Sequence, residues 1–144
     1  MQETGKTDIE LTINGEVGVY SVDKDQSLLS VLRDNGFMSV KCGCDDGTCG
    51  VCTVLIDNKP FYSCKVNAVD VNGSDITTLE GISTREKLHP VQEAFMEAGA
   101  IQCGYCTPAF VLAAQSLLDR NPNPSEQEVR EAISGVLCRC TGYL

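Results

Sequence analysis

The sequence predicts an α+β protein, with a β-rich N-terminal part followed by an all-helical part. In the first half of the chain, apolar residues alternate with polar ones between turn signals, as in half-buried strands. After Gly81, apolar residues recur at helical spacing behind helix-start signals. The nine cysteines also form two groups, five between Cys42 and Cys64 and four between Cys103 and Cys140. We therefore expect two domains, residues 1–80 and residues 81–144.

The first predicted element is a β-hairpin, followed by a short helix. Apolar residues alternate over 9–13, Asn14-Gly15 is the signal for a type I′ turn, and 17–22 forms the second strand. An amphipathic helix over 28–32 should then begin after Asp25 or Ser27 as N-cap and end before Gly36.

A second hairpin and a last strand complete the β-rich part. Residues 51–56 and 61–66 read as two strands on either side of the turn residues 57–60. Residues 76–79 are expected to add one more strand to the same sheet.

The first helix of the second half begins at Pro90 and ends at Gly99. His89 stands just before it, where a lone histidine is a capping or surface residue rather than a ligand or a base. It is the only histidine of the chain, and we expect no catalytic dyad with it.

Two further helices follow. One should begin at Pro108 with Thr107 as N-cap and end at the Asn-Pro-Asn-Pro run. Ser125 and Glu128 form a capping box for the last helix, whose apolar spacing continues to Leu137.

The composition excludes several classes of function. Lys and Arg total 11 against 20 Asp and Glu, a formal net charge of −9, whereas nucleic-acid binding needs clustered basic residues. The longest apolar run, Ala109–Ala114, is far shorter than the roughly 20 residues of a membrane-spanning helix. Residues 1–10 show no secretory signal, so we expect the cytoplasm, where cysteines stay reduced unless metal or redox chemistry uses them.

The first cysteine group has the spacing of plant-type [2Fe-2S] ferredoxins. Cys44, Cys49 and Cys52 give C-x4-C-x2-C, and Cys64 is the distant fourth cysteine. Three thiolates on one loop and a fourth at the end of the following hairpin can converge on two bridged irons. A zinc site of four cysteines is the alternative, and it fits less well because zinc ligands usually come in pairs with short spacers.

Glycines surround this loop, and one cysteine is left over. Gly43, Gly47 and Gly50 are expected to adopt positive φ and to let backbone N–H groups approach the sulfurs. Only Cys44 gives the required spacing, so we expect Cys42 to be a small buried or half-buried side chain. A redox-sensing thiol is the alternative for Cys42.

The second cysteine group supplies four more thiols, Cys103, Cys106, Cys138 and Cys140. The first pair precedes the helix that begins at Pro108, whose positive N-terminal end would help to hold an anionic cluster. Zinc is again the alternative, but a Cys-x-Cys pair is tight for a zinc knuckle. Disulfides would need an oxidising compartment, and nine cysteines cannot all pair.

Four segments together resemble the small iron–sulfur subunit of molybdenum hydroxylases, the family of xanthine dehydrogenase, aldehyde oxidoreductase and carbon monoxide dehydrogenase. The most specific are Gln-Cys-Gly-Tyr-Cys-Thr-Pro at 102–108 and Cys-Arg-Cys-Thr-Gly-Tyr at 138–143, and 37–64 and 88–95 add to them. The resemblance implies a plant-ferredoxin-like β-grasp domain followed by a helical bundle domain, each with one [2Fe-2S] cluster.

The resemblance also implies partners. The cluster of the second group would lie nearer molybdopterin, which Gln102 and Cys140 would contact, and the cluster of the first group would lie toward FAD. A large molybdopterin-binding subunit and an FAD-binding subunit would form a hetero-oligomer with this chain. The chain departs from the usual family pattern at Cys42, at Ala109, where glycine is common, and at Leu144, where many relatives continue into another helix.

We therefore interpret the chain as an electron-transfer subunit of a molybdenum-containing hydroxylase or dehydrogenase, with no substrate-converting site of its own. Electrons would pass from the molybdopterin centre through two [2Fe-2S] clusters toward a flavin or another acceptor. The alternatives are a free-standing ferredoxin-type carrier and a zinc-stapled interaction module.

Overall fold

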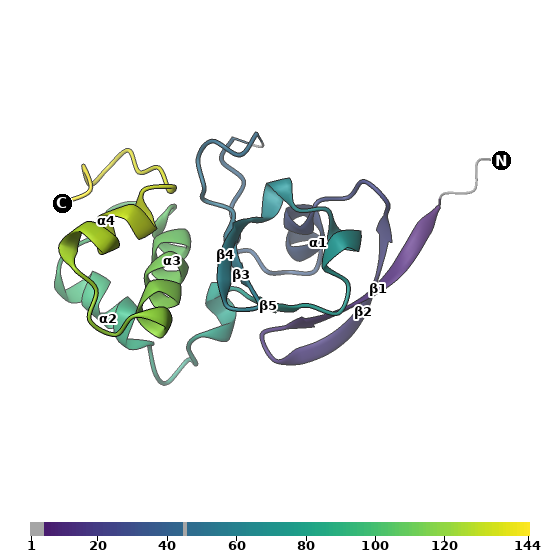
Figure 1. Cartoon of the computed structure of the whole chain (residues 1–144), viewed down its shortest axis with the longest axis horizontal. Coiled ribbons are helices and arrows are strands. Elements are labelled where there is room, and N and C mark those ends of the chain that lie inside the picture. The colour runs from purple at the N-terminus through teal and green to yellow at the C-terminus, as the bar shows by residue number, and fades with distance from the viewer. Residues whose placement is uncertain (1–4, 45) are drawn as a thin grey trace.

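The computed structural model describes residues 5–44 and 46–144, and it confirms the α+β architecture. A five-stranded mixed sheet with one helix makes up the N-terminal half, and three helices make up the C-terminal half (Figure 1). Residues 1–4, which belong to the stretch inspected for a secretory signal, lie outside the described residues. No helix of the described part is long and apolar enough to cross a membrane.

The sheet has the order β2-β1-β5-β3-β4, in which β1 and β5 are parallel and the other pairs are antiparallel. The strands are β1 (Lys6–Ile13), β2 (Glu16–Asp23), β3 (Thr53–Ile56), β4 (Lys59–Tyr62) and β5 (Asp75–Thr77). The helices are α1 (Leu28–Asp34), α2 (Pro90–Glu97), α3 (Thr107–Arg120) and α4 (Glu126–Ile133). Short 3₁₀ helices are η1 (Ser63–Lys65), η2 (Ala68–Val71) and η3 (Leu79–Gly81).

The first hairpin and α1 form where the sequence predicts them. Asn14 and Gly15 have φ of 53° and 83°, the two positive values that a type I′ turn requires. Ser27, rather than Asp25, caps α1 by accepting a hydrogen bond from the N–H of Ser30. Gly36, with φ of 89°, lies just past its end.

The second hairpin is tighter than predicted. Asp57 and Asn58 both have positive φ and form a two-residue turn, so Lys59 and Pro60 belong to β4 and not to the turn. Proline is tolerated there because β4 is an edge strand. The expected strand over 61–66 ends at Tyr62 because η1 begins at the next residue, and the expected strand over 76–79 ends at Thr77.

Helix starts are confirmed in two of three cases. His89 caps α2, its Nδ1 accepting from the N–H of Val91 at 3.2 Å, and Ser125 and Glu128 form the capping box of α4. The prediction of Thr107 as N-cap was wrong, because Thr107 is the first helical residue of α3 and Cys106 precedes it without a side-chain cap. The division into domains at residues 80 and 81 stays a prediction.

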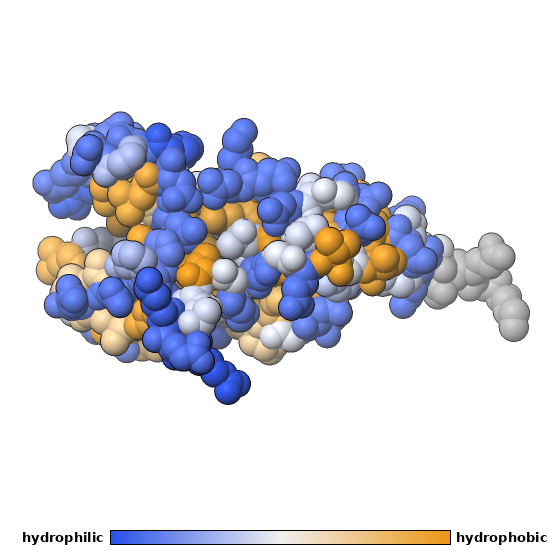
Figure 2. All heavy atoms as spheres, turned by 90° about the horizontal axis from the view of Figure 1, so that it is seen from below, coloured by the Kyte–Doolittle hydropathy of each residue, from blue (hydrophilic) through white to orange (hydrophobic). Residues whose placement is uncertain are grey.

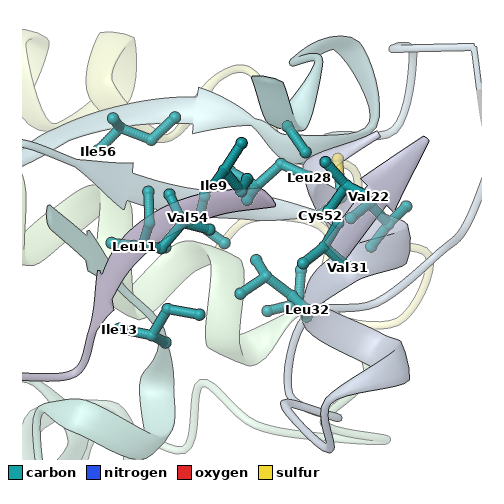
Figure 3. Packing of buried hydrophobic residues seen from close by; sticks show 14 residues of the cluster. Ile9, Leu11, Ile13, Val22, Leu28, Val31, Leu32, Cys52, Val54 and Ile56 are labelled. Carbon is teal, nitrogen blue, oxygen red and sulfur yellow. The ribbon is translucent and has the colours of Figure 1, made fainter. Parts of the chain in front are cut away.

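The main apolar core lies between the sheet and α1 (Figure 3). Ile9, Leu11 and Ile13 of β1 meet Leu28 and Leu32 of α1, all of them buried. A smaller cluster connects the two halves of the chain. Its buried members are Val51, Ala109, Phe110 and Val136.

The surface carries both polar and hydrophobic side chains. Figure 2 shows hydrophobic atoms between polar ones over both the helical part and the strands. The exposed apolar side chains include Val17 and Val19 on β2 and Met96 on α2.

Candidate metal centres

The first four cysteines come from the loop before β3 and from η1, which follows β4. Cys52 is buried immediately before β3, Cys64 lies in η1, and Cys44 and Cys49 are half-buried in the loop. Burial, and then the neighbouring thiols of Cys52 and Cys44, raise the pKa of Cys64 to about 12. Burial also raises the pKa of Cys49, with Cys44 and Cys52 adding to the effect. These thiols are therefore close enough to interact electrostatically.

Backbone N–H groups point at the sulfur of Cys44. The N–H of Thr48 and that of Cys49 each donate to this sulfur over 3.2 Å. The Cys49 N–H is the main reason that the pKa of Cys44 is lowered. Such donors stabilise a thiolate, and they also stabilise the negative charge of an iron–sulfur cluster.

The glycines serve this loop in two ways. Gly47 and Gly50 have φ of 85° and 70°, as predicted. The prediction of positive φ was wrong for Gly43. This glycine instead leaves space for the sulfur of Cys49, because a Cβ at position 43 would lie 2.8 Å from that sulfur.

The prediction for Cys42 was also wrong. Its side chain is exposed, and its carbonyl oxygen accepts a hydrogen bond of 2.7 Å from the hydroxyl of Tyr105. The bond holds the backbone of Cys42 beside the second cysteine group and leaves the thiol toward solvent.

The second four cysteines come from the turn before α3 and the segment after α4. Cys106 precedes α3, and burial, followed by the thiol of Cys138, raises its pKa to about 12. The thiol of Cys103 is the main cause of the raised pKa of Cys140. Cys103 and Cys140 are exposed, whereas Cys106 and Cys138 are half-buried.

Thr141 lowers the pKa of Cys138. Its hydroxyl donates to the sulfur over 3.2 Å and its N–H over 3.5 Å. These two bonds are the main reasons that the pKa of Cys138 falls to about 7.

The donor sets fit two-iron clusters. All nine cysteines are free thiols. In the part of the chain that the structure describes, no three His, Cys, Asp or Glu side chains are placed to hold one metal ion together. A [2Fe-2S] cluster is held by four cysteine thiolates shared between its two irons, and backbone donors to the sulfurs support it.

The two cysteine groups meet where α4 was predicted to continue. The helix ends at Ile133, not at Leu137, and Ser134 is its C-cap. There the hydroxyl of Tyr62 donates to the carbonyl of Gly135 at 2.9 Å, and the N–H of Leu137 donates to the carbonyl of Cys49 at 2.8 Å. Sequence reasoning missed Tyr62, and a glycine inside the predicted helix was the available signal.

Gln102, expected to contact molybdopterin together with Cys140, is exposed in the bend that precedes Cys103. Both side chains of this pair therefore face outward on the free chain. Their role toward a pterin stays a prediction.

The comparisons with known proteins agree with this geometry. A 2Fe-2S iron-sulfur cluster binding domain matches residues 11–84, and a [2Fe-2S] binding domain matches residues 78–144. The nicotinate dehydrogenase small FeS subunit of Eubacterium barkeri is 46% identical over 96% of this chain and 89% of its own length. The xanthine dehydrogenase iron-sulfur-binding subunit of Escherichia coli O157:H7 is 42% identical over 94% of this chain and 86% of its own.

A solved structure is similar over nearly the whole chain. It is quinoline 2-oxidoreductase from Pseudomonas putida 86, with a TM-score of 0.91 and 46% identity. The match covers 96% of this chain and 86% of the matched chain.

Proposed function

This chain belongs to the family of small [2Fe-2S] subunits of molybdenum hydroxylases, and we propose that it connects a molybdopterin-binding partner to an electron acceptor. When bound, its two clusters supply one-electron redox chemistry in series. The chain itself holds the clusters, sets their surroundings and fixes the distance between them.

The observation that carries the proposal is that thiols within each of the two cysteine groups are close enough to shift one another's pKa. In the first group the thiols of Cys52 and Cys44 help to raise the pKa of Cys64. In the second group the thiol of Cys138 helps to raise the pKa of Cys106. We assign the clusters accordingly. The proposed ligands of the first are Cys44, Cys49, Cys52 and Cys64, and those of the second are Cys103, Cys106, Cys138 and Cys140.

The surroundings of the second group support an interface with a larger partner. Gln102, Cys103 and Cys140 are exposed in the free chain, so a partner can approach them directly. We propose that Gln102 and Cys140 contact the molybdopterin of that partner. An FAD-binding subunit would then accept electrons near the first group, and the reducing cytoplasm would suit the free thiols.

Metal analysis and electron paramagnetic resonance (EPR) test the assignment. The purified complex should contain molybdenum, and this chain should carry about four iron and four sulfide, since a [2Fe-2S] cluster has two of each. Reduction with dithionite should give two distinct signals. Zinc in place of iron would support the alternative of an interaction module held together by zinc. A chain that purifies alone with both clusters would support the alternative of a free-standing ferredoxin-type carrier.

Single substitutions assign the ligands. Cys64→Ser should remove the first signal alone, and Cys138→Ser the second alone. Cys42→Ser is the matched control and should keep both, because Cys42 lies outside the two proposed ligand sets. Loss of a signal in the Cys42→Ser protein would contradict the assignment of Cys44 as ligand.

A further inference from the structure

The two cysteine groups share one apolar cluster. Cys49 of the first group packs against it, and so does Cys138 of the second. The cluster lies between the loop before β3 and the N-terminal half of α3, with Val136 closing it from the segment after α4. Cys106 of the second group packs there too, so proposed ligands of both iron–sulfur clusters contact the same apolar residues.

One hydrogen bond joins the backbone beside these two cysteines. The N–H of Leu137 donates to the carbonyl oxygen of Cys49 over 2.8 Å. Leu137 is bonded directly to Cys138. A path of covalent bonds, interrupted by this hydrogen bond, therefore runs from the sulfur of Cys49 to the sulfur of Cys138.

Two glycines let the backbones approach this closely. Gly50 follows Cys49 with φ of 70°, and a Cβ there would overlap the carbonyl oxygen of Gly135 and lie 3.1 Å from the Cα of Val136. A side chain at Gly50 would push the two loops apart. A Cβ at Gly135 would in turn overlap the hydroxyl of Tyr62.

Tyr62 fixes the contact from the side of the sheet. It is the last residue of β4, and its hydroxyl donates to the carbonyl of Gly135 over 2.9 Å in a partly buried position. Because Gly135 stands two residues before Leu137, this bond holds the Leu137 N–H against Cys49. Tyr62 bonds a carbonyl and not a sulfur, so its removal should leave both cluster potentials unchanged.

We propose that Tyr62 is a positioning residue for electron transfer between the two clusters, acting through Gly135 to keep the hydrogen bond between Leu137 and Cys49 formed. The transfer moves one electron from the second group's cluster to the first group's, with no bond made or broken and no proton moved. The inference rests on the proposed function, in which this chain carries both clusters.

Tyr105 offers a matched control. Its hydroxyl also joins the two cysteine groups, by donating to the carbonyl of Cys42 over 2.7 Å. That bond is exposed, and Gly43 separates Cys42 from the proposed ligand Cys44. Tyr105→Phe thus removes the same hydroxyl group from a different contact between the two halves of the chain.

The test compares wild type, Tyr62→Phe and Tyr105→Phe in the complete complex with both clusters present. EPR-monitored redox titration gives the two potentials, and rapid-freeze EPR after flash photoreduction gives the rate at which the electron equilibrates between them. Tyr62→Phe should slow this equilibration several-fold at unchanged potentials and weaken the magnetic coupling between the reduced clusters. Tyr105→Phe should leave the rate and the coupling at the wild-type values. Gly50→Ala, where both clusters still assemble, should slow equilibration more than Tyr62→Phe.

The remaining outcomes contradict either the role of Tyr62 or the proposed function. A wild-type rate in the Tyr62→Phe protein, or equal slowing by both tyrosine variants, contradicts the role of Tyr62 while the proposed function stands. Slowing that is fully explained by shifted potentials contradicts it as well. Fewer than two signals in the wild-type complex contradict the proposed function and this inference together.

Discussion

The hydroxyl of Thr141 donates a hydrogen bond to the sulfur of Cys138, with 3.2 Å between the two atoms. The donor belongs to the Cys-Arg-Cys-Thr-Gly-Tyr motif, and the acceptor is a proposed ligand of the second cluster. Hydrogen bonds to ligand sulfurs raise the reduction potential of a cluster because they stabilise the more negative, reduced state.

Thr141→Val should therefore lower the potential of the second cluster. If the bond is worth about 1 kcal/mol more in the reduced state, the shift is roughly 40 mV for a one-electron couple. EPR-monitored redox titration of the complex measures it. Thr141→Ser, which keeps the hydroxyl, should retain the wild-type potential, and an equal shift in both variants would show that the hydrogen bond is not the cause.

Removing the clusters should loosen the helical half more than the sheet. The apolar core between the sheet and α1 is extensive. The apolar cluster that packs on α3 is smaller, and its buried members are Val51, Ala109, Phe110 and Val136. Bound metal contributes folding free energy directly in such small domains. Hydrogen–deuterium exchange before and after iron chelation should show protection lost over 107–133 and kept over 6–23. Uniform loss, or none, would contradict this.

Local signals predicted much of the fold because they act within a few residues. The Asn14-Gly15 turn and the Ser125 cap need no distant partner, and both form as predicted. Just past the end of α4, the carbonyl of Gly135 accepts a hydrogen bond from Tyr62, 73 residues away, and helical spacing cannot report such a contact. The apolar Leu137 continues the helical pattern, yet its N–H is used by Cys49 instead.

The candidate site shows the same division between local and distant signals. The spacing of the cysteines is a local property of the sequence, and the two ligand sets that it predicts stay a prediction. The exposure of Cys42 depends on how Tyr105 from the second half holds its backbone. The role of Gly43 depends on the sulfur of Cys49, which the folded loop places above it.

The thiols of the first group should differ in reactivity once the metal is removed. The N–H of Cys49 lowers the pKa of Cys44, so its thiolate, the reactive form, should appear at lower pH than in an ordinary cysteine. Burial raises the pKa of Cys64 to about 12, so Cys64 should stay protonated well above neutral pH. Alkylation with iodoacetamide over a pH series, read by peptide mass spectrometry, should modify Cys44 at lower pH than Cys64. In urea the difference should vanish, and its persistence there would rule out the folded loop as the cause.

Asn14 in the turn of the first hairpin forms two hydrogen bonds with Thr78, the residue that follows β5. Its amide donates to the hydroxyl of Thr78 over 2.8 Å, and its carbonyl oxygen accepts from the N–H of Thr78, also over 2.8 Å. Asn14→Ala should cost about 2 kcal/mol, because it removes two hydrogen bonds and leaves a Cβ residue at φ of 53° without compensation. Urea unfolding followed by circular dichroism measures the loss.

Asn14→Gly separates the two contributions to that loss. Glycine keeps the turn at no steric cost and still lacks both hydrogen bonds, so this variant should be less destabilised than Asn14→Ala. The difference between the two variants then reports the cost of positive φ, and the remainder reports the bonds to Thr78. Equal stability of Asn14→Gly and wild type would mean that the bonds to Thr78 contribute nothing, and that the parallel pairing of β1 with β5 alone holds this end of the sheet.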